Sequence, residues 1–116
     1  MTPGNLPLPI YRGDSYGWRF VLWKDPEKTL AVDLTDASAK AEIRTAPGGK
    51  LLAAIDTYVE LPNIVVASLS AAKTATLTAA GGSWDLQLTY AANGEVQTVL
   101  AGKVTVTLDV TEAAAP

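Results

Sequence analysis

The C-terminal third of the chain alternates hydrophobic and polar residues in two runs that a turn signal separates. A period of two is the pattern of a β-strand with one buried face, because successive side chains point to opposite sides of the strand. Asn93-Gly94, between the runs, is the strongest short-range signal for a β-hairpin. The sequence therefore predicts an antiparallel hairpin. Its core-facing residues are Trp84, Leu86, Leu88 and Tyr90 in the first run and Val104, Val106 and Leu108 in the second.

Residues 16–23, YGWRFVLW, form another alternating run, rich in aromatic and β-branched side chains. This composition predicts a strand whose first face enters the core through Trp18 and Phe20. The second face carries Arg19, Val21 and Trp23 and is also partly apolar. We expect the N-terminal segment or a loop to cover this second face. A subunit interface is the alternative.

Turn residues divide the middle of the chain into shorter elements. Asp-Pro, Ala-Pro-Gly-Gly and Pro-Asn signals separate them. Residues 69–77 differ, because Leu69, Lys73 and Leu77 fall at helical spacing around Ser70, a suitable N-cap. We expect one or two helical turns there, ended by the glycines at 81–82. The predicted strands are residues 39–44, 51–60 and 64–67.

The N-terminal segment contains three prolines, Pro3, Pro7 and Pro9, which forbid a helix and favour extended backbone. Its alternating Leu6, Leu8 and Ile10 predict an arm that lies on apolar surface, either of its own domain or of a neighbour. The predicted organisation is an extended arm at 1–10, one β-sandwich domain at 11–111 and a frayed tail at 112–116.

Short strands separated by turns, with one helical turn, predict an all-β fold: an immunoglobulin-like antiparallel β-sandwich. Because the chain has no cysteine, the core rests on packing alone. The predicted core residues are Trp18, Phe20, Ile43, Trp84, Leu86, Leu88 and Val106.

Composition argues against most enzymatic and nucleic-acid functions. The chain has no histidine and no cysteine, which removes the usual neutral-pH base, thiolate catalysis and most zinc sites. Its formal net charge of -3 gives no support to nonspecific binding of nucleic acid or an anionic membrane. Residues 1–10 lack the pattern of a signal peptide. We expect a soluble, unexported, non-enzymatic protein without cofactor or metal.

Two further groups of residues deserve a chemical interpretation. Asp33 and Asp36 lie three apart in a turn, but the turn lacks the third carboxylate and the glycine of a calcium loop, so capping of the turn is the expected role. Exposed aromatic residues would instead favour a carbohydrate-binding module, which stacks sugars on aromatic faces. The aromatic residues concerned, most of which we expect in the core, are Tyr11, Tyr16, Trp23 and Tyr58.

The order LPLPIYRGDSYGWRFVLW, DLTDASAKAEIR, LSAAKTATL, GGSWDLQLTY and GEVQTVLAGKVTVTLDV resembles a group of small virion proteins of tailed bacteriophages. The resemblance covers nearly the whole chain. It implies the sandwich fold and a structural role at the tail end, as a collar or baseplate component that anchors tail fibres. It also implies partners among copies of the chain and other tail or capsid proteins, in a virion assembled in the host cytoplasm.

By the same resemblance, Gly13, Asp14 and Ser15 form the turn into the first long strand, and Asp33 and Thr35 form the turn into the next. Arg12 to Ser15 spell Arg-Gly-Asp-Ser, but we interpret this stretch as a turn in which Gly13 bends the backbone and Asp14 or Ser15 caps it, not as a receptor ligand. A capsid decoration protein and a carbohydrate-binding module are the alternatives. The candidate interface residues are Pro7, Leu8, Pro9, Arg12, Arg19, Val21 and Trp23.

Overall fold

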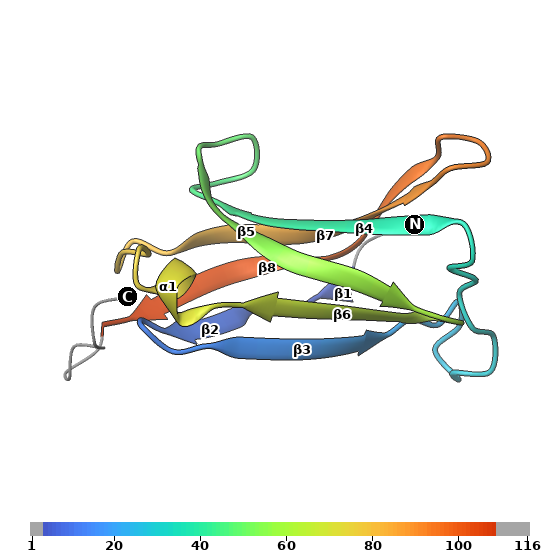
Figure 1. Cartoon of the computed structure of the whole chain (residues 1–116), viewed down its shortest axis with the longest axis horizontal. Helices are drawn as coiled ribbons and strands as arrows, with labels where there is room; N and C mark the ends of the chain where they lie inside the picture. Colours follow the sequence, from blue (N-terminus) through green and yellow to red (C-terminus); the bar gives the residue numbers. More distant parts are fainter. Residues whose placement is uncertain (1–3, 109–116) are drawn as a thin grey trace.

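The computed structural model describes residues 4–108, so the predicted tail at 112–116 and the end of the predicted domain at 109–111 lie outside the described residues. Figure 1 shows the strands and the short helix in their spatial arrangement. The elements are β1 (Gly4–Asn5), β2 (Leu8–Tyr11), β3 (Tyr16–Val21), β4 (Ala37–Arg44), β5 (Leu51–Glu60), β6 (Ile64–Leu69), α1 (Ala71–Thr74), β7 (Gly82–Tyr90) and β8 (Val96–Thr107).

One continuous sheet curls into two facing layers. Its strand order is β1-β8-β7-β4-β5-β6-β3, with β2 also paired to β8. Strand β5 belongs to both layers, because its first half pairs with β4 and its second half pairs with β6. The layers β8-β7-β4 and β5-β6-β3 have the adjacencies of the two sheets of an immunoglobulin domain. The predicted all-β, immunoglobulin-like fold is confirmed.

The N-terminal segment is extended, as predicted, but it is part of the domain's own sheet. Strands β1 and β2 run parallel to β8, so the sandwich is not purely antiparallel. Leu8 and Ile10 are each only 2% exposed and enter the core. Pro9 faces outward on β2, in keeping with the rule that proline is tolerated on edge strands. The N-terminal segment therefore lies on its own domain and not on a neighbouring molecule.

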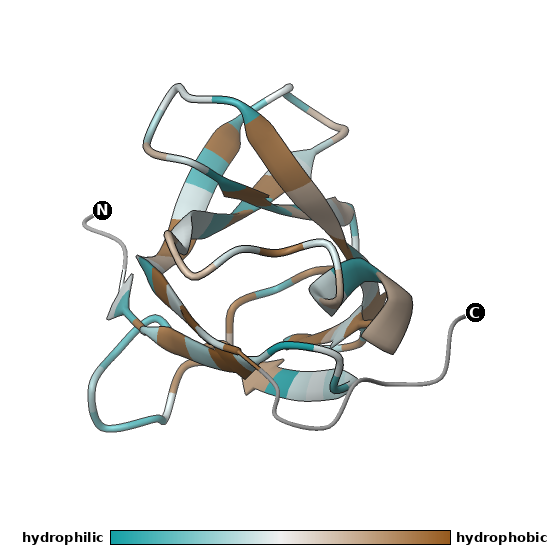
Figure 2. Cartoon of the chain, turned by 90° about the vertical axis from the view of Figure 1, so that its left-hand side faces the viewer, coloured by the Kyte–Doolittle hydropathy of each residue, from teal (hydrophilic) through white to brown (hydrophobic). Residues whose placement is uncertain are grey.

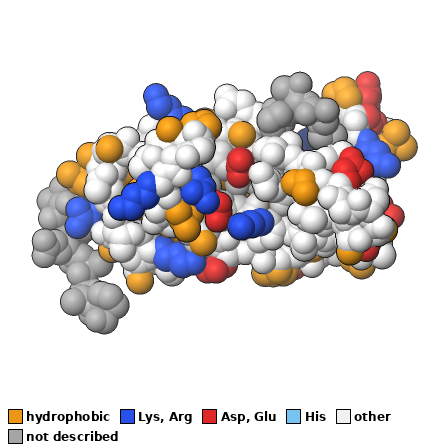
Figure 3. All heavy atoms as spheres, turned by 90° about the horizontal axis from the view of Figure 1, so that it is seen from above, with side chains coloured by type: hydrophobic (Ala, Val, Ile, Leu, Met, Phe, Trp, Pro, Cys, Tyr) orange, Lys and Arg blue, Asp and Glu red, His pale blue; other side chains and the backbone are white. Residues whose placement is uncertain are grey.

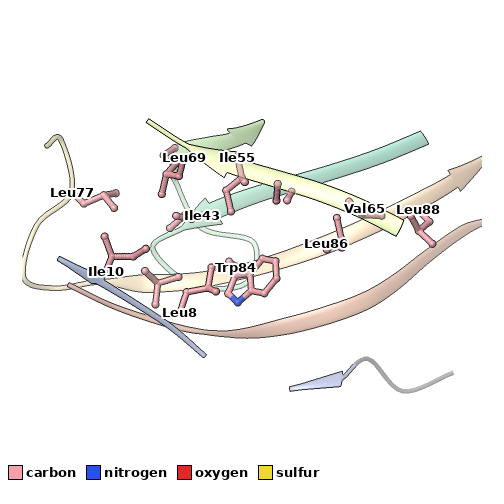
Figure 4. Close-up of a cluster of buried hydrophobic side chains, with 14 of the residues drawn as sticks. Leu8, Ile10, Ile43, Ile55, Val65, Leu69, Leu77, Trp84, Leu86 and Leu88 are labelled. Atoms are coloured by element: carbon pink, nitrogen blue, oxygen red, sulfur yellow. The ribbon is translucent and has the colours of Figure 1, made fainter. Parts of the chain in front are cut away.

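The core lies between the two layers, where side chains from both point toward one another (Figure 4). Ile43, Trp84, Leu86 and Leu88 are buried, as predicted. The other predicted core residues, Trp18, Phe20 and Val106, are partly buried and pack against this cluster. Each fully buried large side chain contributes roughly 1.5 to 3 kcal/mol. Figure 2 shows the same alternation of hydrophobic and hydrophilic residues along the strands.

Local signals account for the helix and the hairpin. The Ser70 hydroxyl accepts a hydrogen bond from the Lys73 amide at 3.2 Å and caps α1, which is a single turn. Gly94 has φ +70° in the β7–β8 turn, a conformation that suits glycine. The Asn93 side chain accepts from the Glu95 amide at 2.9 Å in the same turn.

Candidate protein-binding surface

The Arg-Gly-Asp-Ser stretch is a tight turn held by residues distant in sequence. Gly13 has φ +89°, which strains any residue with a side chain. Its amide donates to Thr74 Oγ1 at 3.0 Å, and the Thr74 hydroxyl donates to the Asp14 carbonyl at 2.7 Å. The Tyr11 amide donates to Tyr16 Oη at 2.7 Å. The structure thus ties the ends of this turn to α1 and to β3.

The side-chain caps expected from Asp14 and Ser15 are not found within residues 4–108. There, Thr74 and the Tyr16 hydroxyl bind the polar backbone groups of the turn. Thr74 is fully buried, at 0% exposure. The sequence did not indicate this role for Thr74, because Thr74 lies 60 residues from Asp14 along the chain and its local pattern predicts only a helical turn. A threonine in a short apolar helix was the available signal.

The second predicted turn closes on itself. Asp33 Oδ1 accepts hydrogen bonds from the Thr35 amide at 3.0 Å and from the Thr35 hydroxyl at 2.6 Å. The Thr35 hydroxyl and amide, which bind the charged form, lower the pKa of Asp33. Leu34 between them is 1% exposed and anchors the turn in the core. This geometry is that of an Asx turn.

The second face of β3 is exposed. Val21 is 41% and Trp23 is 37% exposed, so the expected covering by the N-terminal segment or a loop is wrong for the described chain. The reason is that β2 pairs with β8 in the other layer and leaves this face bare. Leu8, proposed as an interface residue, is instead buried in its own core.

Neighbouring strands extend this exposed face into a surface of six residues. Across the strands, Arg19 pairs with Val66 and then Tyr58, while Val21 pairs with Ile64 and then Glu60. Tyr58 is 58% exposed, and Arg19 and Glu60 form an ion pair at 3.5 Å. We call this set the outer face. It consists of Arg19, Val21, Tyr58, Glu60, Ile64 and Val66.

The opposite layer carries a pocket of about 330 Å³ next to the β4–β5 turn, lined by both apolar and charged residues. Glu42 and Asp85 lie directly across from each other in it. Glu42 is held by Arg44 at 2.9 Å, whereas burial, and then the Glu42 charge, raises the pKa of Asp85. Seen from above, Lys and Arg side chains gather beside Asp and Glu side chains on the left half of the view (Figure 3). Four charged side chains, Lys40, Glu42, Arg44 and Asp85, line this pocket, whereas the outer face carries one ion pair among apolar side chains.

A second hollow, of about 510 Å³, lies where the loop before β4 meets the β7–β8 turn. Asp33, Asp36 and Tyr90 line it. Burial, followed by the charges of Glu95 and Asp33, raises the pKa of Tyr90. The Asp36 carboxylate accepts from the Ala92 amide at 2.7 Å, which joins the two loops. Within residues 4–108 no group of three or more acidic, histidine or cysteine side chains is placed to hold a metal ion.

Comparisons with known proteins concern the fold alone. No protein-family model matches the sequence, and no curated protein matches it. Among solved structures, the chain is similar to the crystal structure of Sidekick-1 immunoglobulin domains 1–4, with a TM-score of 0.49 and 16% identity. The match covers 97% of this chain and 25% of that one. In the described part of the chain, no helix has the length and hydrophobicity to span a membrane.

Proposed function

We propose that this protein is a non-enzymatic structural component of a tailed bacteriophage virion. In this role it forms a collar or ring at the tail or baseplate and anchors tail fibres or neighbouring tail proteins. The outer face supports the proposal. It presents four apolar side chains, those of Val21, Tyr58, Ile64 and Val66, on three paired strands. Paired strands form a more rigid surface than loops do, and a rigid apolar surface suits permanent contact with another protein.

Charge and symmetry agree with this role. The net charge of -3 favours neither nucleic acid nor an anionic membrane as the partner. A small protein that encircles a tail must repeat by symmetry, so copies of the chain are partners as well as tail, baseplate, fibre or capsid proteins. The Arg19–Glu60 pair, which joins β3 to β5 across β6, supplies one charge of each sign to orient such contacts.

Incorporation into particles tests the outer face directly. A tagged wild-type chain and a Tyr58→Lys chain are produced in the bacterial culture in which the particles assemble, and the particles are purified. We expect the wild type in the particles and at least about tenfold less of the variant, because a lysine cannot be desolvated against an apolar partner. Thr89→Lys, exposed in the other layer, is the matched control and should be incorporated like the wild type. Equal incorporation of both variants contradicts the role of the outer face.

Two alternatives have different observable consequences. A capsid decoration protein would use the same fold on the head, so its location in the particle separates it from a collar. A carbohydrate-binding module is favoured by Tyr58 and Trp23, at 58% and 37% exposure, which sequence reasoning placed mainly in the core. Quenching of tryptophan fluorescence by sugars, lost in Trp23→Ala, would support that module in place of the structural role.

A further inference from the structure

Strand β3 ends the sheet order and leaves one edge of its backbone open. The Leu22 amide donates to the Asn63 carbonyl on the β6 side at 2.8 Å. Backbone groups of successive residues point alternately to the two sides of a strand. Phe20 and Trp18 therefore face β6 as Leu22 does. Gly17, Arg19 and Val21, which alternate with these residues, direct their N–H and C=O groups to the open side.

The open edge continues to Trp23. Past the end of β6, the segment around Ala31 pairs with residues 22–24 on the side that β6 occupies along β3. The Lys24 amide donates to the Leu30 carbonyl at 2.7 Å, and the Val32 amide donates to the Leu22 carbonyl at 3.1 Å. The backbone of Trp23 therefore points outward. Within residues 4–108, the N–H and C=O groups of residues 17, 19, 21 and 23 make no hydrogen bond outside the strand ladder, and the alternation of the strand turns them away from β6. This edge is about 20 Å long.

The two ends of the sheet differ in how they are protected. Proteins usually block an exposed edge with proline, a bulge or a charged residue, since an open edge is a template for another strand. The edge formed by the N-terminal segment has Pro7 and Pro9. The β3 edge has no proline and pairs with β6 in an unbroken register, with Arg19 as its one charged residue. An unprotected edge beside an apolar face is suited to strand pairing.

We propose that the β3 edge pairs with the β3 edge of a second copy of this chain, antiparallel and about a two-fold axis at Phe20. This pairing would be one of the contacts between copies in the collar or ring, and the inference rests on the proposed function. In this register, Arg19 lies opposite Val21 of the partner subunit. Gly17, which has no side chain, lies opposite Trp23 of the partner subunit, and an aromatic residue across from an edge glycine is a favourable pair.

Charge selects this register over its neighbour. A two-fold axis at Arg19 would also align the open backbone groups, but it would place the two arginines directly opposite each other, which is destabilising. The axis at Phe20 separates them. It joins the two β5-β6-β3 layers into one sheet across the dimer and makes the two outer faces continuous. The pair of copies is then self-complementary, as a two-fold contact requires.

Charge variants at Val21 test the register by sedimentation equilibrium of the purified full chain. Val21→Lys places two like-charged pairs across the axis and should weaken the dimer about tenfold, whereas Val21→Glu faces the partner's Arg19 and should tighten it by a similar factor. Thr89→Lys is the control. It lies exposed on β7 in the other layer, away from the β3 edge, so it should change the dimer constant by less than about twofold.

Amide hydrogen exchange supplies a second measurement that does not depend on the variants. The Phe20 amide, paired with β6, should exchange slowly in monomer and dimer, while the Val21 amide should become slow only on dimerisation. A chain that is monomeric at every concentration, or equal effects of Glu and Lys at position 21, overturns the pairing. If the chain is monomeric but is still incorporated into particles, the strand pairing is wrong and the proposed function stands. If the chain dimerises but is absent from all particles, the proposed function is wrong and the strand pairing stands.

Discussion

The hydroxyl of Thr74 donates to the backbone carbonyl of Asp14 across 2.7 Å and 60 residues of chain. The same oxygen accepts from the Gly13 amide at 3.0 Å. One buried side chain on a single-turn helix thus satisfies both polar groups of the Arg-Gly-Asp-Ser turn. Residues outside the turn thus fix its conformation, which makes this stretch part of the fold and accounts for the glycine at position 13.

Removal of the Thr74 hydroxyl should destabilise the fold. Thr74→Val keeps the shape of the side chain but leaves the Gly13 amide and the Asp14 carbonyl without this partner. We expect a loss of roughly 1 to 3 kcal/mol in the free energy of unfolding, measured by urea titration. Thr76→Val removes an exposed hydroxyl that donates to the nearby Lys73 carbonyl, and it should reduce the free energy of unfolding much less. Equal losses for the two variants would show that the long-range bonds do not matter.

The turn itself should depend on Gly13 and hardly at all on the Asp14 side chain. Gly13→Val forces a β-branched residue to φ +89° and should cost about 1 to 2 kcal/mol or more. Asp14→Ala should unfold within about 0.5 kcal/mol of wild type, because it is the Asp14 backbone that Thr74 binds. Thermal denaturation of the two variants checks both statements. A Gly13→Val protein that melts like wild type would contradict the observed turn.

Gly102 should hold the N-terminal segment in the sheet. A Cβ at this position would meet the Leu6 carbonyl oxygen, a backbone atom that also accepts from Trp84 Nε1 at 2.7 Å. Gly102→Ala should therefore displace residues around Leu6 and speed exchange of the Leu6 amide, which donates to Ala101 at 2.9 Å. Gly17→Ala is the matched control, since its Cβ would meet only Ala67 O at an ordinary 3.9 Å. Unchanged exchange in Gly102→Ala would be the contrary result.

Asp85 should reduce stability at neutral pH. Burial, together with Glu42, raises its pKa above 3.8, so the folded chain binds this proton more tightly than the unfolded chain. The cost of the ionised form is complete above the raised pKa and disappears as pH falls through it. Asp85→Asn should thus be more stable than wild type at about pH 7 and lose that advantage at about pH 3. Urea unfolding at both pH values tests the sign.

Asp33 should behave in the opposite way. Its hydrogen bonds from Thr35 lower its pKa, so its contribution to stability is present at neutral pH and is lost as pH falls below 3.8 and through the lowered value. Asp33→Asn should therefore be less stable than wild type at about pH 7, with a smaller difference in strong acid. A variant with the same pH dependence as Asp85→Asn would contradict this assignment.

Much of the fold was accessible from local sequence signals. Alternation located β3, β7 and β8, and Asn93-Gly94 and Ser70 marked a hairpin and a helix start, because each depends on neighbours in the chain. The parallel pairing of β2 with β8 was not accessible. It is decided by packing of Leu8 and Ile10 against a strand almost a hundred positions later, and period-two alternation carries no information about a strand's partner.

The surface was harder to predict than the core. Trp23 and Val21 were expected to be covered because large apolar residues usually are. Both are exposed, because the N-terminal segment pairs with β8 in the other layer and does not reach them. The outer face combines three strands, and only their register brings Tyr58 beside Val66. No local pattern contains that register. Conversely, the placement of Arg19 and Val21 on the face opposite Trp18 and Phe20 needed only the alternation of one strand.

The location of the protein in intact particles tests the proposed structural role most directly. Particles from the source culture are labelled with gold-conjugated antibody to this chain and viewed by electron microscopy. We predict label confined to the tail end, in the symmetric pattern of a collar or baseplate ring. Label over the head would contradict the tail assignment in favour of decoration, and particles without label would contradict the virion role altogether.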